Sequence, residues 1–178
     1  DETSFLFPND LAFGPDGTLY LTDSGILFHQ LVASDDKIRE DFRDLAMDGR
    51  IYRIDVTTRQ VEMIDSGLRF ANGLAFGPDQ NLYVAETLTG MIYRYPCANG
   101  RVVGGREAFG PVIDQGTGNM PFQGPDGMAF GLNGCLYVAV YGQGHIAVLA
   151  PDGTLVERIA TKGAKPTNLA FGGPGERK

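Results

Sequence analysis

Three polar residues hold the same place in three similar segments of the chain: Asn9, Asn72 and Asp126. Each stands four positions before the phenylalanine of a shared motif (Phe13, Phe76 and Phe130). Two carboxamide oxygens and one carboxylate are ligands that hard divalent cations such as Ca²⁺, Mg²⁺ and Mn²⁺ prefer. Asn and Asp are also common in turns before strands. The residue types therefore leave two interpretations open, a metal site and a turn.

The segments around these residues are copies of one structural unit. They read FPNDLAFGPDGTLYLTD at 7–23, ANGLAFGPDQNLYVAE at 71–86 and GPDGMAFGLNGCLYVAV at 124–140. PTNLAFGG is a shortened fourth copy, in which Thr167 takes the polar position. In each full copy an apolar run leads into a turn and then into a strand-like run. This order predicts two strands joined by a tight turn.

Two further strand-like runs follow each pair, such as GRIYRID at 49–55, where alternation with period two indicates a half-buried strand. Four short strands in each unit are typical of a β-propeller blade. We therefore predict an all-β fold, a β-propeller with three four-stranded blades and the first strand of a fourth. The single partial domain, 1–178, has blades at about 8–66, 71–115 and 125–162 and the start of the next at 166–173.

The number of blades sets a second expectation. Closed propellers usually have four to eight blades, so three alone would leave sheet faces uncovered. We expect the remaining blades to come from the rest of a longer chain or from a second copy. In a propeller the first strand of every blade lines the central channel, so Asn9, Asn72 and Asp126 should face one axis.

The composition limits the classes of binding partner and the cellular compartment that we expect. The formal net charge is -7, and Lys and Arg form no stripe, which disfavours nucleic acid and anionic membranes. No apolar run approaches the roughly 20 residues of a membrane helix. Cys97 and Cys135 lack metal-site or redox spacing and are expected to be free thiols, which favours a cytoplasmic location. Secretion stays open, because the chain does not begin with Met.

Two segments interrupt the repeats. In 26–48 the residues Ile38, Phe42 and Leu45 recur at helical spacing, which predicts a short amphipathic segment over one face. It is either a lid over a site or a solvated loop with a few packed side chains. The segment 114–124 is Gly-rich but lacks the GK[ST] ending of a phosphate-binding loop, so we interpret it as a connection between blades.

Taken in order, the motifs PNDLAFGPDGTLYLTDSG, RFANGLAFGPDQNLYVAET, GPDGMAFG, LYVAVYGQG and PTNLAFGG resemble the regucalcin/gluconolactonase family, also called the senescence-marker-protein family. The resemblance covers essentially the whole chain and implies the middle-to-late portion of a six-bladed propeller with one divalent metal in its channel. It implies Asn72 and Asp126 as metal ligands and Asn9 beside the metal, in contact with substrate or metal-bound water. A family Glu from the first blade has no counterpart here.

The resemblance also implies a reaction, the metal-dependent opening of a sugar lactone or related ester. Ca²⁺ is the favoured ion, with Mn²⁺, Mg²⁺ and Zn²⁺ as alternatives. Asp126 would bind the metal or act as the catalytic general base, although a carboxylate of ordinary pKa, about 3.9, is a poor base at neutral pH. The alternative is a non-catalytic propeller fragment that serves as a divalent-cation-binding or interaction module.

The remaining candidates are weighed as structural or functional residues. Tyr141 is a candidate for packing or for substrate contact, as is Gln143. Asp23 and Glu86 end matching strands, where Val140 stands in the third copy, so we favour a structural or solvent-facing role. His145 is interpreted as packed or superficial, and His29 lies in the insertion. The repeated aromatic residues are predicted to form the core between blades (Phe13, Phe76, Phe130, Tyr20, Tyr83 and Tyr137).

Overall fold

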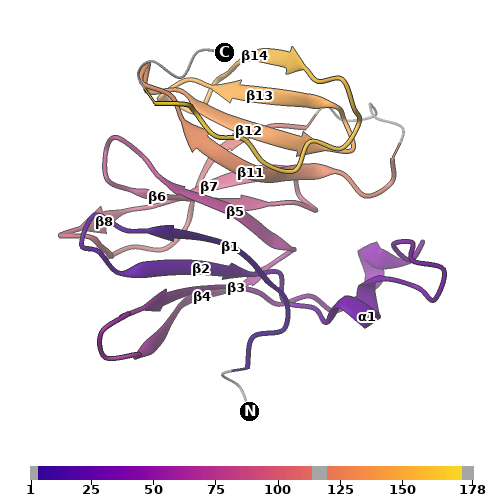
Figure 1. Ribbon diagram of the computed structural model, residues 1–178, viewed down its shortest axis with the longest axis horizontal. Helices are drawn as coiled ribbons and strands as arrows, with labels where there is room; N and C mark the ends of the chain where they lie inside the picture. The colour runs from indigo at the N-terminus through magenta and orange to yellow at the C-terminus, as the bar shows by residue number, and fades with distance from the viewer. Residues whose placement is uncertain (1–3, 114–119, 174–178) are drawn as a thin grey trace.

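The computed structural model describes residues 4–113 and 120–173 and is an all-β structure. It contains three open, four-stranded antiparallel sheets and one two-stranded hairpin (Figure 1). Within the described residues no helix is long and apolar enough to cross a membrane. Cys97 and Cys135 are free thiols, as expected. The all-β prediction is therefore confirmed.

The strands run in chain order within each sheet. The first sheet contains β1 (Pro8–Phe13), β2 (Leu19–Asp23), β3 (Gly49–Ile54) and β4 (Val61–Leu68). The second contains β5 (Ala71–Phe76), β6 (Leu82–Glu86), β7 (Met91–Tyr95) and β10 (Glu107–Pro111). The third contains β11 (Gly124–Phe130), β12 (Leu136–Tyr141), β13 (His145–Leu149) and β14 (Leu155–Ala160). The hairpin pairs β8 (Cys97–Ala98) with β9 (Arg101–Val102).

The first strands of the three sheets meet in the middle of the molecule. Figure 1 shows β1, β5 and β11 near one another, with β4 and β14 at opposite ends. The strand β5 contacts both β1 and β11. The pairing register repeats as well, because Pro8 faces Asp23, Ala71 faces Glu86 and Pro125 faces Val140. Equivalent residues of the three repeats are thus brought to equivalent places.

Aromatic pairs join each sheet to the following repeat. The rings of Tyr20 and Phe76 meet edge to face with centroids 5.1 Å apart, and those of Tyr83 and Phe130 with centroids 4.9 Å apart. Tyr137 and Phe171 form the same pair at 5.0 Å. Such contacts add to the stabilisation that burial provides. The predicted aromatic core between repeats is therefore present at these pairs.

Phe13 is the exception among the predicted core residues. It is 64% exposed, because no described sheet precedes β1 to supply a tyrosine that packs on it. Residues 166–173 also differ from the expectation, since no strand is assigned to them. No described strand pairs with residues 166–173 in a β-ladder. The Thr167 carbonyl nevertheless accepts a hydrogen bond from the Gly127 N–H at 2.8 Å, and Phe171 takes the repeat position of Phe130.

The insertion 26–48 is not one amphipathic helix. It contains a single helical turn, α1 (Phe28–Leu31), a bridge between Val32 and Ile38, and a 3-10 turn, η1 (Phe42–Asp44). The turn-forming Ser34-Asp35-Asp36 stretch interrupts the helical spacing, and Asp36 has a positive φ of 60°. Ile38, Phe42 and Leu45 still pack into one apolar cluster. Most of the predicted connection 114–124 lies outside the described residues.

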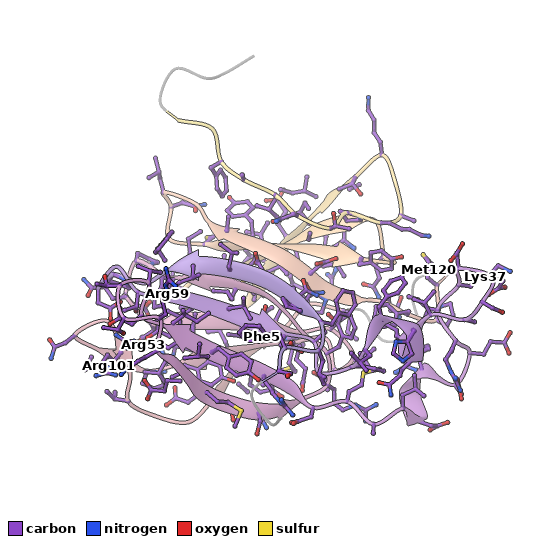
Figure 2. All side chains as sticks on the ribbon, turned by 60° about the horizontal axis from the view of Figure 1, so that its bottom comes forward. Phe5, Lys37, Arg53, Arg59, Arg101 and Met120 are labelled. Atoms are coloured by element: carbon purple, nitrogen blue, oxygen red, sulfur yellow. The ribbon has the colours of Figure 1, made fainter. Side chains whose placement is uncertain are left out.

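The insertion lies at one end of the molecule. Figure 2 shows Lys37 and Met120 at the end opposite Arg53, Arg59 and Arg101. Arg53 forms an ion pair with Asp16 at 2.9 Å, and Arg101 forms one with Glu62 at 3.2 Å. Arg53 and Arg101 are therefore engaged with carboxylates of the protein.

The aromatic pairs lead to a test with a matched control. Phe76→Ala should lower the free energy of unfolding by about 3 kcal/mol, because it removes a ring packed on Tyr20. Phe13→Ala, at the same repeat position but exposed, should change it by less than about 0.5 kcal/mol. Urea unfolding followed by circular dichroism measures both values. Equal losses would contradict the role assigned to the aromatic pairs.

Candidate functional site

The three predicted polar residues line one cavity. Asn9 lies on β1, Asn72 on β5 and Asp126 on β11, and all three border a cavity of about 430 Å³. Thr87 and Thr167 border the same cavity. The structure therefore brings together the positions that the repeat spacing marked as equivalent, including that of the fourth copy.

The side chain of Asn72 is held in one orientation. The hydroxyl of Thr87 donates a hydrogen bond to the Pro125 carbonyl at 2.8 Å, so its oxygen is left as an acceptor. The Nδ2 atom of Asn72 donates to that oxygen at 3.1 Å. Its Oδ1 atom is consequently turned away from Thr87. This Oδ1 is buried and has no hydrogen-bond partner among the described residues.

Asn9 is held in the same way by Ser24. The Nδ2 of Asn9 donates to the Ser24 hydroxyl at 2.9 Å, and this hydroxyl donates to the Ala71 carbonyl at 3.0 Å. Each hydroxyl thus links the amide of its own sheet to the backbone of the following inner strand. Sequence reasoning missed Ser24 and Thr87. The available signal was that they directly follow Asp23 and Glu86 in matching repeats.

The third repeat replaces both parts of this arrangement. Asp126 stands where the other repeats have Asn, and Tyr141 stands where they have Ser24 and Thr87. Tyr141 lines the cavity, as its prediction as a substrate contact requires. The change puts the single carboxylate of the three-residue set on β11.

The surroundings of Asp126 favour its protonated form. Burial raises the pKa of this carboxyl from its ordinary value of 3.8 to about 7, while the nearby Gly127 N–H and Asn72 side-chain amide act in the opposite direction. The negative charge of Asp10 adds to the rise in pKa. A carboxylate with a pKa near neutrality can accept a proton at physiological pH. The raised pKa therefore suits Asp126 to act as a general base at neutral pH, which a carboxylate of ordinary pKa does poorly.

Asp23 and Glu86 have structural partners. The Asp23 carboxylate is fully buried and accepts hydrogen bonds from the backbone N–H groups of Leu6 at 2.6 Å, Phe7 at 3.1 Å and Gly25 at 2.8 Å. Glu86 accepts from the Arg69 N–H at 2.6 Å. Both carboxylates thus tie down the segment that leads into an inner strand. Neither borders the cavity around Asn72.

The other polar candidates also lie outside this cavity. His145 is buried at the start of β13, where it pairs with Val140. His29 belongs to α1 and is exposed. The cavity lining includes neither histidine, nor does it include Gln143. Among the described residues, no three His, Cys, Asp or Glu side chains gather as a metal-binding group. The candidate ligands are therefore mainly amide oxygens.

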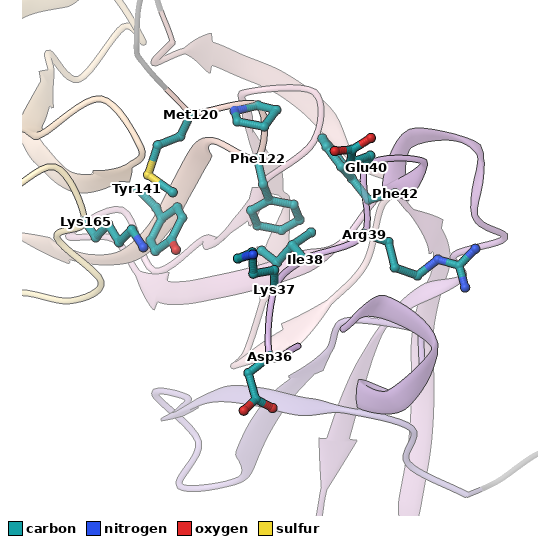
Figure 3. A pocket seen from close by; sticks show the side chains of 11 residues that line it. Asp36, Lys37, Ile38, Arg39, Glu40, Phe42, Met120, Phe122, Tyr141 and Lys165 are labelled. Atoms are coloured by element: carbon teal, nitrogen blue, oxygen red, sulfur yellow. The ribbon is translucent and has the colours of Figure 1, made fainter. Parts of the chain in front are cut away.

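Asn9, Asn72 and Asp126 form what we call the polar floor of the cavity, and aromatic and aliphatic side chains surround it. Phe7 and Phe70 come from the segments that precede the inner strands, and Phe122 precedes β11. The insertion adds apolar residues on the same side (Phe28, Leu31, Val32 and Ile38). Figure 3 shows Phe122 beside Ile38, with Tyr141 on its other side. The cavity therefore combines a small set of oxygen atoms with an apolar wall, a composition typical of small-molecule sites.

This combination defines the class of protein: a repeat of four-stranded antiparallel sheets, whose inner strands carry amide and carboxylate groups into one apolar-walled cavity. Within this class, the chain belongs to the SMP-30/Gluconolactonase/LRE-like family, whose region model matches residues 1–178. The family resemblance predicted from the sequence motifs is confirmed.

Named relatives include enzymes that act on lactones. The chain is 32% identical to the 6-deoxy-6-sulfogluconolactonase of Pseudomonas putida over 70% of this chain and 41% of that protein. It is 29% identical to the gluconolactonase of Zymomonas mobilis over 97% of this chain and 47% of that protein. The solved structure of XC5397, a gluconolactonase from Xanthomonas campestris, matches with a TM-score of 0.65 and 27% identity, covering 92% of this chain and 50% of that one. The chain thus spans about half the length of these relatives.

The raised pKa of Asp126 predicts a pH dependence of stability in metal-free protein. Its folded-state pKa of about 7 lies above its ordinary value of 3.8, so the wild type should lose stability as the pH rises from about 4 to 7. Asp126→Asn cannot ionise and should not show this loss. The variant should therefore gain stability relative to the wild type between pH 4.5 and pH 8.

Urea unfolding in the presence of EDTA at the two pH values measures this gain. Asp152→Asn is the control, because Asp152 is exposed and its pKa is lowered by the Thr154 backbone N–H. A difference between Asp126→Asn and the wild type that stays constant with pH would contradict the effect of burial on the charge.

Proposed function

We propose that the chain forms part of a divalent-metal-dependent hydrolase of the gluconolactonase type, which opens a sugar lactone or a related ester. One observation carries the proposal: Asn72, whose Oδ1 is buried and has no hydrogen-bond partner among the described residues, lines the same cavity as Asp126. Buried polar atoms rarely lack a partner in folded proteins. The lactonases among the relatives support the reaction class.

The residues fit a hard divalent cation. The hydroxyls of Thr87 and Ser24 engage the amide nitrogens of Asn72 and Asn9, which leaves the amide oxygens as the available ligand atoms. Asp126 adds a carboxylate, whose desolvated charge a cation would offset. Asn72, Asp126 and Asn9 would hold the ion. Oxygen ligands of this kind favour Ca²⁺, with Mg²⁺, Mn²⁺ and Zn²⁺ as alternatives.

The proposed mechanism gives each of these side chains a role. A bound divalent ion supplies Lewis-acid polarisation of the ester carbonyl and lowers the pKa of a nearby water. Asp126 accepts a proton from the attacking water, whose oxygen adds to the carbonyl carbon. The ring C–O bond then breaks, and Asp126 returns the proton to the departing alkoxide, so the product is a hydroxy acid. Asn9 and Tyr141, which border the same cavity, would contact the substrate.

The three sheets are proposed to be blades of an incomplete six-bladed propeller, with boundaries near those predicted from the repeats. The exposed ring of Phe13 supports this arrangement, because it lacks the tyrosine partner that Phe76 and Phe130 have. The remaining blades would come from the rest of a longer chain, with a second copy as the alternative. The share of the relatives that the chain spans favours the longer chain. A cytoplasmic location stays a prediction.

A second candidate function is a non-catalytic module that binds a divalent cation or another protein. The low number of charged ligands favours this candidate, because Asp126 is the one carboxylate among Asn9, Asn72 and Asp126. Measurement of activity separates this candidate from the hydrolase.

The hydrolase assignment is tested at Asp126. Asp126→Ala should lower kcat/KM for lactone hydrolysis by about 10³-fold, because it removes the proposed base and a cation ligand. Hydrolysis is followed by proton release after EDTA treatment and after addition of Ca²⁺, Mg²⁺, Mn²⁺ or Zn²⁺. Asp152→Ala, on an exposed turn, should retain wild-type activity. Full activity of Asp126→Ala would refute the proposal.

The role of the Thr87 hydroxyl is tested by cation binding. Thr87→Val should weaken binding of Tb³⁺, a luminescent substitute for Ca²⁺, by about tenfold or more, because Asn72 loses the acceptor that orients it. Thr87→Ser keeps the hydroxyl and should bind within about twofold of the wild type. Terbium luminescence titrations measure the affinities. Equal affinities of the Val and Ser variants would show that the hydroxyl does not position Asn72.

A further inference from the structure

The wall of the cavity is built largely by apolar side chains from outside the repeats. The insertion 26–48 separates β2 from β3 and places Phe28, Leu31 and Ile38 at the cavity. Phe7, Phe70 and Phe122 complete the wall and belong with these residues to one apolar cluster or its immediate contacts. The insertion therefore does more than connect two strands, because it encloses the space beside Asn72 and Asp126.

The aromatic rings of the wall pack on one another. Phe7 meets Phe28 with centroids 5.9 Å apart and Phe70 with centroids 6.2 Å apart. Phe70 meets Phe122 at 5.3 Å, and Phe122 meets Tyr141 at 6.2 Å. All of these contacts are edge to face, the geometry that aromatic pairs favour. The wall is thus a continuous aromatic surface from Phe28 to Tyr141.

Phe28 stands out in this surface because 57% of its side chain is exposed, whereas Phe70 and Phe122 are buried. An exposed aromatic ring that borders a cavity offers contact area to an apolar ligand. Phe28 is held by Phe7 at its edge, so its ring presents a defined surface.

The donor groups of the two asparagines and of Thr87 are already engaged. The amide nitrogens of Asn9 and Asn72 donate to hydroxyls, and the Thr87 hydroxyl donates to Pro125. A polyhydroxylated ring needs a partner for each hydroxyl that it buries, because an unpaired buried polar group opposes binding. The phenylalanine rings of the wall supply no such partners, and the wall side offers only the Tyr141 hydroxyl and the Asp36 carboxylate among the described residues.

The cations near the wall do not indicate a charged substrate. A neighbouring cavity of about 320 Å³ shares Ile38, Phe122 and Tyr141 with the first one (Figure 3). Lys37, at its edge, pairs with Asp35 at 2.8 Å, and Arg39 pairs with Asp41 at 2.6 Å. The third cation of this lining, Lys165, lies over the ring of Tyr141, with its Nζ 5.9 Å from the ring centroid. All three cations are therefore engaged by groups of the protein itself, which favours an uncharged substrate.

We propose that the insertion 26–48 forms the specificity wall of the site and selects a neutral lactone or ester with an alkyl or aryl substituent over a polyhydroxylated sugar lactone. This inference rests on the proposed hydrolase function, within which it names the substrate class. The polar floor would face the ester group, and the ring surface from Phe28 to Tyr141 would contact the substituent.

Hydrolysis of lactones with the same six-membered ring tests the substrate class. With the metal-loaded protein, kcat/KM should be at least about tenfold higher for dihydrocoumarin and for δ-decalactone than for glucono-δ-lactone. Proton release measures all three rates. A higher kcat/KM for glucono-δ-lactone would overturn the inference while leaving the hydrolase function in place.

A variant of the wall separates recognition from intrinsic reactivity. Phe28→Ser should lower kcat/KM for the aryl and alkyl lactones by about tenfold and leave that for glucono-δ-lactone within about twofold. Leu132→Ser is the matched control, because Leu132 is a fully exposed apolar residue of a turn outside the cavity, and it should change none of these values. Equal losses on all substrates in Phe28→Ser would overturn the role of the wall.

A binding measurement keeps the inference testable without catalysis. Lactams resist ring opening, so 3,4-dihydro-2-quinolinone and gluconolactam serve as analogues of the aryl and sugar lactones. Ligand-observed NMR should show binding of the aryl lactam at least about tenfold tighter, and Phe28→Ser should remove this preference. Binding of the aryl lactam without hydrolysis of any lactone would refute the hydrolase and support the wall. Tighter binding of gluconolactam would refute the wall.

Discussion

The close approach of the inner strands is the constraint on which the site depends. A Cβ atom on Gly73 would lie 2.2 Å from the Asp126 carbonyl oxygen, and one on Gly127 would lie 2.2 Å from Oδ1 of Asn168. At Gly73 the obstacle is backbone, so only glycine lets β5 approach β11 this closely. At Gly127 a Cβ atom would also lie 2.9 Å from the Thr167 carbonyl oxygen, so glycine suits the approach of β11 to the segment after β14. The neighbouring residues Asn72 and Asp126 reach one cavity because their backbones lie this close together.

The first repeat meets the same constraint with a different residue. Asp10 stands where the later repeats have Gly73 and Gly127. Its carboxylate accepts a hydrogen bond from the Leu74 N–H at 3.0 Å, while the Thr22 hydroxyl donates to the Asn72 carbonyl at 2.6 Å. The contact between β1 and β5 is therefore made by polar side chains, whereas β5 and β11 meet through backbone. In both cases the polar residue just before this position faces the cavity.

Much of the fold could be predicted because the pattern of each strand is local. Alternation and turn residues marked the strands, and the offset from Phe76 or Phe130 marked the equivalent polar positions. The prediction for Phe13 was wrong because its burial depends on a tyrosine that no described segment supplies. The helical spacing of Ile38 and Phe42 was misleading in another way. Their burial reflects contact with Phe70 and Phe122, which lie far away in the chain.

The sequence by itself determined the repeats, the strand pattern and the shared position of Asn9, Asn72 and Asp126, since these follow from short-range periodicity. Only the tertiary structure decided how those groups behave. Thr87 orients Asn72 because it also bonds Pro125 in the next sheet, and Asp126 has a raised pKa because packing desolvates it. The aromatic wall likewise joins rings from five separate segments. Orientation, desolvation and enclosure depend on contacts between distant residues, which local sequence patterns do not specify.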